Sequence, residues 1–329
     1  MIFGRRKKRR LAELPLRKAG PKRRMLLVVN PYASTVSDRL KNVVIYALQS
    51  RYEIEAIDTR ERNHATEIVR AALKQGDHDI VCSFGGDGTA NEVINGMAGS
   101  DVPFTFLPGG MTNVIGRILG IPGDIVDATE HLLTVADNWE PRRIDLGDAN
   151  GRCFVFAAGA GLDADIVRVC ESRPGMKSMF GQNFYLAAAV STFIGSYALR
   201  RARLQIRTDG IETKGVVAVA QNGRPFTYFG AREIDLAEAA GLENRSLSLT
   251  VLDRANPIDF PPIVTRLLSQ KLKVSSNRHI KIVDEFVEAT ITPRRKNGKP
   301  IPLQVDGDYV GDFEEINFKV LPGALSVVA

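Results

Sequence analysis

The stretch that decides the fold is residues 79–92, DIVCSFGGDGTANE. It begins with an apolar run typical of a buried parallel strand, continues through three glycines, and runs into a predicted helix over 89–97. Glycines let the backbone come close to a phosphate, and the start of a helix presents free N–H groups to an anion. The stretch therefore predicts a strand, a phosphate-binding turn and a helix.

The carboxylate inside this turn needs its own explanation, because it would repel a phosphate. Asp87 makes chemical sense there if it organises a Mg²⁺ ion, directly or through water. The alternative is a tight turn in which Asp87 caps the helix. The turn is not a Walker-type phosphate loop, since it has no Lys followed by Ser or Thr.

The same alternation of strand and helix surrounds this stretch. Strands are predicted over 25–30, 52–58, 79–84 and 104–107, and helices over 37–50, 65–75, 89–97 and 113–119. This spacing predicts a Rossmann-like parallel sheet with helices on both faces, in which ligands bind beyond the carboxyl ends of the strands. Three loops leave those ends, at 30–34, 85–89 and 108–113, so their polar residues should converge.

The pattern of predicted elements changes at about residue 143. From there on, short strand-like runs separated by polar turns predict a mainly β, sandwich-like domain. The runs cover 153–158, 202–208, 215–220, 247–252, 279–283, 289–292, 301–305, 316–320 and 325–328. A helical insertion is predicted near 175–200. Its apolar stretch, 184–199, is too short and too polar to span a membrane and fits a core helix.

Charge is distributed unevenly along the chain. Residues 1–24 contain 11 of the 44 basic residues and one of the 38 acidic ones, so the remainder is net acidic. A basic tail on an acidic body argues against a nucleic-acid-binding fold and suits an anionic membrane surface. The alternative is a solvated tail without a dedicated partner.

The charge distribution and the predicted elements together divide the chain into three parts. They are a basic tail (1–24), a nucleotide-binding α/β domain (25–142) and a mainly β lipid-binding domain (143–329).

Cysteine usage and the amino-terminal region bear on location. Cys82, Cys153 and Cys170 are odd in number and far apart, which predicts reduced thiols in a cytosolic protein. No apolar segment follows the basic run 5–10, so the tail does not read as a secretory signal. Together with the basic tail, these features predict a cytoplasmic protein that binds peripherally to the inner face of the membrane.

The GGDGT turn after a buried strand resembles the superfamily that contains diacylglycerol, sphingosine and ceramide kinases, NAD kinases and 6-phosphofructokinases. Further segments resemble the lipid-kinase branch, most closely its soluble bacterial members. They are Val29–Ser34, Thr59, Leu107–Asn113, Leu119–Pro122, Gly159–Ala164, Gln304–Asp308 and Val320–Leu325. This resemblance implies an ATP-dependent kinase that phosphorylates the hydroxyl of diacylglycerol, a sphingoid base or ceramide.

The resemblance also implies a site. Its nucleotide-binding residues would be Asn30, Pro31, Ser34, Thr59, Gly85, Gly86, Asp87, Gly88, Thr89, Asn91, Glu92, Gly109, Gly110, Thr112 and Asn113. ATP and Mg²⁺ would be the cofactors, with Asp87 organising the metal. Asp308 would be the general base that accepts the proton of the lipid hydroxyl. Asp163 would contact the acceptor, or else cap a helix that begins near Ala164.

One motif supports two interpretations that can hold together. Asp306-Gly307 between apolar runs is a strong signal for a β-hairpin turn. A turn tip is also a good place to present a base, so Asp308 can belong to both. The division into two domains would leave a cleft between the nucleotide-type sheet and the β domain, and the last segment of the chain can pack back on the first domain.

The sequence also departs from the family pattern. Met111 stands where the family usually has Thr, Val114 where many members have Asp, and Asp308 where the family has Glu. Asn244 aligns with a carboxylate that binds a structural Mg²⁺ in bacterial diacylglycerol kinases, and the loss of its charge argues against that metal here. Glu243 is the neighbour that could substitute.

These departures keep a second and a third hypothesis open. The second is a soluble metabolite kinase of the NAD kinase type, against which the features beyond GGDGT argue. The third is a non-catalytic nucleotide- or lipid-binding homologue.

Overall fold

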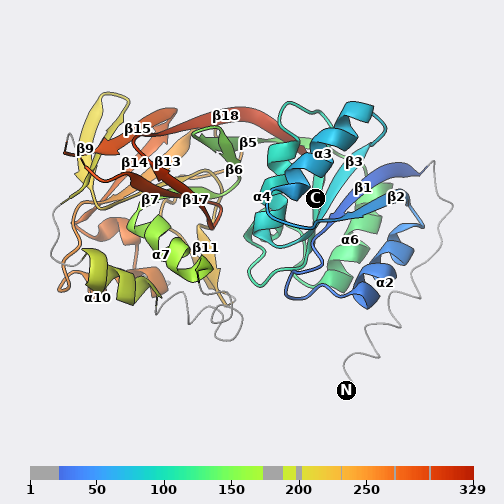
Figure 1. Cartoon of the computed structure of the whole chain (residues 1–329), viewed down its shortest axis with the longest axis horizontal. Helices are drawn as coiled ribbons and strands as arrows, with labels where there is room; N and C mark the ends of the chain where they lie inside the picture. Colours follow the sequence, from blue (N-terminus) through green and yellow to red (C-terminus); the bar gives the residue numbers. More distant parts are fainter. Residues whose placement is uncertain (1–21, 173–187, 198–201, 231, 270–271, 296–297) are drawn as a thin grey trace, which may run out of the picture. The chain divides into compact units, whose positions relative to one another are not determined.

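The computed structural model describes residues 22–172, 188–197, 202–230, 232–269, 272–295 and 298–329. The chain divides into two compact units, Met1–Ile144 with Ala324–Ala329 (unit 1) and Asp145–Gly323 (unit 2). Figure 1 draws both. The first 21 residues of the predicted tail and most of the predicted insertion near 175–200 lie outside the described residues. Residues 188–197 of that insertion are helical, with Phe193 and Tyr197 buried.

Unit 1 is built on a parallel sheet. Its strands are β1 (Arg23–Val29), β2 (Tyr52–Asp58), β3 (Ile80–Gly85) and β4 (Phe104–Pro108), in the order β2-β1-β3-β4, with the end of β18 (Ile316–Val327) beside β4. Every residue of β3 and β4 is buried, whereas β2 lies at the edge and all its residues after Tyr52 are half-buried or exposed. Burial on both faces explains why the central strands are continuous apolar runs.

Helices cover both faces of this sheet (Figure 1). They are α2 (Asp38–Leu48), α3 (His64–Gln75), α4 (Asp87–Gly96), α5 (Val114–Ile118) and α6 (Ile125–Asp137). Helix α3 packs on α4, and α2 packs on α6. The sequence missed α6, although Asp124 caps it by accepting a hydrogen bond from the Val126 backbone N–H (3.0 Å).

Unit 2 is an antiparallel sandwich. One sheet has the order β14-β13-β10-β7-β16-β17, and in the other β18 pairs with β15, β15 with β8, and β8 with β9. The core between them includes Phe154 and Phe318, whose rings meet edge to face with centroids 6.4 Å apart. The predicted fold class, an α/β domain followed by a mainly β domain, is confirmed.

The remaining elements belong to unit 2. The strands are β5 (Arg142–Ala149, which begins in unit 1), β6 (Arg152–Phe154), β7 (Ala157–Gly161), β8 (Leu204–Thr208), β9 (Ile211–Gly215), β10 (Val217–Gln221), β11 (Thr227–Phe229), β12 (Arg232–Ile234), β13 (Leu247–Leu252), β14 (Ile280–Phe286), β15 (Glu288–Pro293), β16 (Ile301–Val305) and β17 (Asp308–Phe313). The helices are α7 (Leu162–Glu171), η1 (Phe193–Tyr197), α10 (Phe260–Leu268) and η2 (Val274–Ser276).

Several sequence-based boundaries were wrong. The run predicted over 153–158 covers parts of two strands, β6 and β7. The two runs 316–320 and 325–328 form one strand, β18, which continues through Gly323 because that glycine adopts a left-handed φ of 56°. Helix α4 begins at Asp87 rather than Thr89, since Gly86 is its N-cap. Helix α10 was not predicted. Within the described residues, no helix is long and apolar enough to cross a membrane.

Candidate functional site

The loops after β1 and β3 flank the point where the strand order reverses. Strand β2 lies on one side of β1 and β3 on the other, which in doubly wound sheets marks the ligand-binding crevice. Asn30 joins the two loops. Its backbone N–H donates to the Phe84 carbonyl (2.9 Å), and its side-chain amide donates to the Thr89 hydroxyl (3.0 Å).

The glycines after β3 and β4 pack directly on one another. The Gly109 N–H donates to the Gly85 carbonyl (2.7 Å). A Cβ added at Gly109 would lie 2.9 Å from Gly85 Cα, and one added at Gly110 would lie 2.8 Å from Gly86 Cα. At Gly109 and Gly110, backbone packing against backbone requires glycine, whether or not a phosphate also approaches. At Gly85, an added Cβ would instead lie 2.8 Å from the Thr89 hydroxyl oxygen, and at Gly86 its nearest neighbour would be 3.5 Å away.

The third loop is closed by its own asparagine. Asn113 has a left-handed φ of 50°, accepts from the Gly110 N–H and donates to the Gly110 carbonyl, both at 2.9 Å. The Thr35 N–H donates to the Gly109 carbonyl (3.1 Å), which joins this loop to the first. The predicted convergence of the three loops is therefore confirmed.

Asp87 lies between two helix starts. It is in the first turn of α4, and its Oδ1 accepts from the backbone N–H of Ile115 in the first turn of α5 (2.8 Å). Each helix start carries a partial positive charge that favours an ionised carboxylate. Asp87 is thus a cap, although of α5 rather than of its own helix. A half-buried carboxylate here also suits Mg²⁺, which prefers oxygen ligands.

Two of the implied nucleotide residues have structural partners behind the loops. The Glu92 carboxylate accepts from the backbone N–H groups of Asn63 (2.8 Å) and Ala65 (3.3 Å) at the start of α3. Asn91 is fully buried, and its Oδ1 accepts from the side chain of Asn95 (3.1 Å). Both residues stabilise the helices that support the glycine turn.

The other implied residues of unit 1 lie at the same sheet edge. Ser34 is exposed, whereas Pro31, Gly86, Gly88 and Thr112 are half-buried. The N–H of buried Thr59 donates to the Val29 carbonyl (2.8 Å), which places Thr59 beside the end of β1. Next to Thr112, the side chain of Met111 is 47% exposed, an apolar group where the family usually has a hydroxyl.

In unit 2, Asp308 follows a two-residue hairpin turn. Val305 pairs with Asp308 across the turn, and both Asp306 (φ 47°) and Gly307 (φ 84°) are left-handed. That conformation defines the hairpin turn type that Asp-Gly favours, so the predicted hairpin is confirmed. The Asp308 side chain is 27% exposed, and its Oδ2 lies 4.0 Å from the Arg152 guanidinium.

The first aspartate of this motif has a different role from the second. Asp306 is buried, and its carboxylate accepts from the backbone N–H groups of Val155 (2.8 Å), Phe156 (3.0 Å) and Ala157 (3.2 Å). These bonds fix the base of the hairpin to the connection between β6 and β7. Sequence reasoning placed Asp306 in the turn but found no partner for its carboxylate, and it assigned no role to Arg152, because the partners are about 150 residues away.

Asp163, in the first turn of α7, has a partner inside unit 2. Its Oδ2 accepts from the side-chain amide of Gln304 on β16 (2.7 Å). Burial raises the pKa of Asp163 to about 6, against the opposing effect of that hydrogen bond. At the other end of α7, Glu171 accepts from the Tyr309 N–H (2.8 Å), so both ends of the helix hold the hairpin. A contact between Asp163 and the acceptor stays a prediction.

The segment that resembles a structural metal site is held by other means. The Asn244 side chain donates to the Ala239 carbonyl (2.7 Å), and Glu243 is exposed. Buried Asp145 accepts from the N–H groups of Arg245 (2.6 Å) and Gly323 (2.7 Å). Among the residues that the structure describes, no group of three or more His, Cys, Asp or Glu side chains could hold a metal ion.

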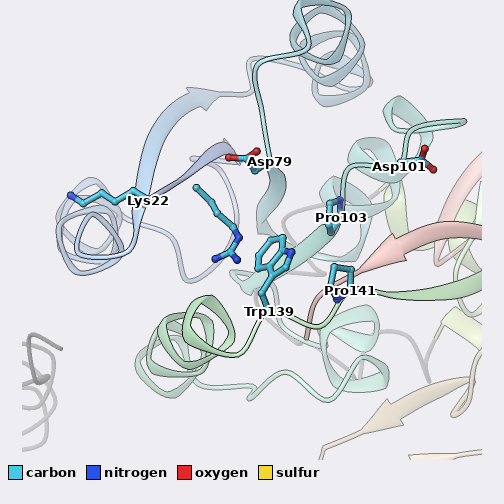
Figure 2. Close-up of a pocket in the computed structure, with 7 residues that line it drawn as sticks. Lys22, Asp79, Asp101, Pro103, Trp139 and Pro141 are labelled. Atoms are coloured by element: carbon cyan, nitrogen blue, oxygen red, sulfur yellow. The ribbon is translucent and has the colours of Figure 1, made fainter. Parts of the chain in front are cut away.

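A cavity of about 450 Å³ in unit 1 lies at the opposite edge of the sheet (Figure 2). Its lining consists of Lys22, Arg23, Asp79, Asp101, Pro103, Trp139 and Pro141. Lys22, Asp79 and Pro103 directly precede β1, β3 and β4, so the cavity lies at the amino ends of the strands. The Arg23 guanidinium stacks on the Trp139 ring, 4.0 Å from its centroid. This cavity is separate from the glycine loops.

Comparisons with known proteins agree with these observations. Residues 24–149 match the model of the diacylglycerol kinase catalytic domain. A diacylglycerol kinase of Bacillus subtilis (strain 168) is 30% identical over 269 residues, which cover 80% of this chain and 82% of that protein. One from Staphylococcus haemolyticus is 28% identical over 274 residues, covering 83% and 77%. The crystal structure of a diacylglycerol kinase from Bacillus anthracis shares the fold, with a TM-score of 0.71, 20% identity and coverage of 94% and 98%.

The fold and the matched catalytic domain define a lipid kinase enzyme. The chain belongs to the diacylglycerol kinase family. The family resemblance seen in the sequence is therefore confirmed. The metabolite-kinase hypothesis of the NAD kinase type and the hypothesis of a non-catalytic homologue lose their support. As a family of kinases, these proteins use ATP, a divalent metal and a lipid acceptor.

Proposed function

We propose that this chain transfers the γ-phosphate of ATP to the hydroxyl of a membrane lipid, with Asp308 as the general base. The candidate acceptors are diacylglycerol, a sphingoid base and ceramide, and diacylglycerol comes first because the similar proteins carry its name. The observation that carries the proposal is the accessible Asp308 carboxylate beside a hairpin turn fixed by three hydrogen bonds to buried Asp306.

The nucleotide would bind at the joined loops of unit 1. The start of α4 and the close glycine backbones suit the phosphates of ATP. The contacting residues we propose are Asn30, Pro31, Ser34, Thr59, Gly85, Gly86, Asp87, Gly88, Thr89, Gly109, Gly110, Thr112 and Asn113. Asn91 and Glu92, carried over by the resemblance, would act from behind the loop by stabilising α3 and α4.

Asp87 is the residue that would organise Mg²⁺. When bound, the ion would neutralise negative charge on the phosphates during transfer. What the chain itself supplies is an ionised carboxylate held at two helix starts, where its charge is stabilised.

Asp308 would act on the acceptor. As the lipid hydroxyl oxygen bonds to the γ-phosphorus, the bond from that phosphorus to the leaving oxygen of ADP breaks. The hydroxyl proton passes to the Asp308 carboxylate. Arg152, 4.0 Å from Asp308 Oδ2, would orient the carboxylate. The side chain is one methylene shorter than the Glu usual in the family, so its placement by the turn matters more.

The proposal is tested by transfer of labelled phosphate from ATP to lipids in mixed anionic vesicles. The panel holds diacylglycerol, monoacylglycerol, sphingosine and ceramide, with NAD as a soluble control. Asp308→Ala should lower the rate for the labelled lipid by about 10² to 10⁴-fold, the usual contribution of a general base. Full activity in Asp308→Ala would remove its role as base, and label in NAD alone would overturn the lipid acceptor.

Asp312→Ala is the matched control for Asp308. Asp312 lies on the same strand, β17, and also faces an arginine, Arg168, at 3.5 Å. Because exposed ion pairs contribute little, this variant should stay within about twofold of the wild-type rate.

The metal role of Asp87 needs a separate pair of variants. Asp87→Asn keeps an oxygen that can accept from the Ile115 N–H but removes the charge, so Mg²⁺-dependent transfer should be abolished while the fold stays intact. Asp124→Asn makes the same change at another helix start in unit 1, and Asn caps helices as well as Asp does. Equal Mg²⁺ dependence in both variants would remove the metal role.

We also propose that the basic tail brings the enzyme to anionic membranes. Each Lys or Arg near such a surface contributes about 1 kcal/mol, and residues 1–24 contain 11 of them. Deletion of residues 1–22 should weaken binding to anionic vesicles and make the remaining binding less sensitive to salt. Unchanged vesicle binding would remove this role of the tail.

A further inference from the structure

We propose that Gln304 and Asp163 form a positioning pair that sets the geometry of the hairpin turn before Asp308. The inference rests on the proposed function, because it matters only if Asp308 is the base. It assigns a role to two side chains that the transfer step itself does not use.

The pair is a continuous chain of hydrogen bonds. The Nε2 of Gln304 donates to Asp163 Oδ2 (2.7 Å), and the Oε1 of Gln304 accepts from the backbone N–H of Gly307 (2.9 Å). Because a carboxylate can only accept and an N–H can only donate, the amide has one usable orientation. Asp163 therefore fixes which atom of Gln304 faces the turn.

The turn lies between two fixed points of the hairpin. Asp306 is held by three backbone N–H groups, and Tyr309 is held by Glu171. Gly307 and Asp308 lie between them, and Gln304 supplies the side-chain acceptor for the Gly307 N–H. Loss of that bond would free the peptide that directly precedes the base.

Strand β17 has an extra residue opposite the position of Gln304. Leu303 faces Gly311 and Gln304 faces Tyr309, so Val310 has no partner on β16, while Val305 faces Asp308. Bulges of this kind re-aim side chains and recur next to active sites. This bulge lies two residues beyond Asp308, on the strand that Asp308 begins.

The neighbouring strand leaves room for the pair. Gly159 on β7 lies opposite Gln304 in the sheet. A Cβ at Gly159 would overlap the Asp163 carboxylate and lie 2.8 Å from Gln304 Nε2. Gln304 itself is only 3% exposed.

Asp163 is not a favourable residue for stability alone. Burial raises its pKa to about 6, which means that its ionised form is disfavoured in the fold. A carboxylate retained under such conditions is a candidate for a functional role. The clash at Gly159, the bulge and the hydrogen-bond chain all point to the same role.

The test inverts the polarity of the pair. In Gln304→Glu, two carboxylates face each other, so the substituted side chain can no longer bridge Asp163 and the turn. In the double variant Asp163→Asn/Gln304→Glu, the introduced amide donates to the introduced carboxylate, which still accepts from the Gly307 N–H. The full-length chain is assayed with ATP, Mg²⁺ and anionic vesicles that contain the lipid labelled by the wild type.

We expect kcat of Gln304→Glu to fall at least about tenfold while the KM for ATP stays within about twofold, a loss confined to the placement of the base. The double variant should recover kcat to within about threefold of the wild type, because the chain of bonds is restored. A merely structural role would not produce this split between kcat and KM, nor the rescue.

Gln221→Glu is the matched control for a buried carboxylate. Gln221 lies in the same sheet, on β10, two strands from β16, and its amide also bridges two backbone groups, those of Gly223 and Ala237. The control should lower thermal stability comparably but keep kcat per folded molecule within about twofold, since it leaves the turn before the base unchanged.

The outcomes separate the inference from the proposed function. Wild-type kcat in Gln304→Glu, with transfer lost in Asp308→Ala, would overturn the inference and leave the function standing. Full transfer in Asp308→Ala would overturn the function first. If Gln304→Glu does not fold, the double variant decides: folded and active supports the pair, folded and inactive overturns it.

Discussion

The candidate functional residues of the two units are held in different ways. In unit 1, the three loops are joined mainly through backbone groups and glycines that touch, and Asn30 and Asn113 are the neutral side chains that complete the joins. In unit 2, the hairpin is held by the carboxylates of Asp306 and Glu171 and by the Gln304 amide. Although the Asp87 carboxylate also accepts from the Ile115 N–H, the loops depend mainly on shape and the hairpin mainly on charge, so the same kind of mutation should act differently in each.

The largest effect should come from the buried carboxylate of the hairpin. Asp306→Ala leaves three buried backbone N–H groups without their acceptor, each of which costs about 1 to 3 kcal/mol. We expect a loss of about 3 to 5 kcal/mol in the free energy of unfolding, measured by urea denaturation. Asp306→Asn, which keeps one acceptor oxygen, should fall between. A loss below about 1 kcal/mol would show that unit 2 does not depend on this charge.

In unit 1, the corresponding mutation would act through a steric clash between the loops. Gly110→Ala places a Cβ 2.8 Å from Gly86 Cα and 3.0 Å from Asn113 Oδ1, so the two loops must separate. We expect a loss of about 1 to 3 kcal/mol, the usual cost of overpacking, and at least about tenfold weaker ATP binding by calorimetry. Gly123→Ala, whose nearest neighbour is 3.9 Å away, is the control and should change neither. Unchanged ATP binding in Gly110→Ala would mean that the loop contact is dispensable.

Substitution of Asp163 should raise the stability of the fold, whereas the two substitutions above lower it. Its pKa is about 6 in the fold against an ordinary value of 3.8, so the folded chain binds this proton more tightly than the unfolded chain. Stability therefore falls as pH rises from about 4 to about 6, and the loss is complete above about pH 6. Asp163→Asn should be more stable than the wild type by about 1 to 2 kcal/mol at about pH 7.5 and equal to it near pH 4. Equal stability at both pH values would contradict the burial of the charge.

The sequence was sufficient for features whose signal is local. Glycine runs after apolar runs predicted the loops of unit 1, and Asp-Gly predicted the hairpin, because both patterns restrict the backbone over a few residues. Helix α6 was missed despite its Asp124 cap, because it follows α5 without a strand between them and so departs from the alternation of strand and helix. The edge of the sheet at which we expect ligands to bind followed from topology alone.

The roles of individual side chains were less predictable, because they depend on partners far along the chain. Glu92 acts on the start of α3 about 30 residues earlier, and Asp306 acts on backbone groups about 150 residues away. Gln304 belongs to the segment Gln304–Asp308, but sequence reasoning assigned this side chain no role. Its two partners, Asp163 and Gly307, are seen only in the structure. Spacing shows which residues are adjacent in one element, but not which surface of another element they meet.

The smallest effect should come from substitution of Gly307. Glycine is needed in this chain for a left-handed backbone at some positions and for close packing at others. Gly307 has a φ of 84°, and an added Cβ would meet nothing within 4 Å, whereas Gly110 clashes but is not left-handed. Gly307→Ala should therefore cost only the left-handed conformation, about 1 to 2 kcal/mol, and Gly307→Asn less, since Asn tolerates that conformation. Urea denaturation gives these costs, and the KM for ATP should not change in either variant. If Gly307→Asn were as damaging as Gly307→Ala, the glycine would be needed for more than its backbone angle, and the hairpin would depend on shape as the loops do.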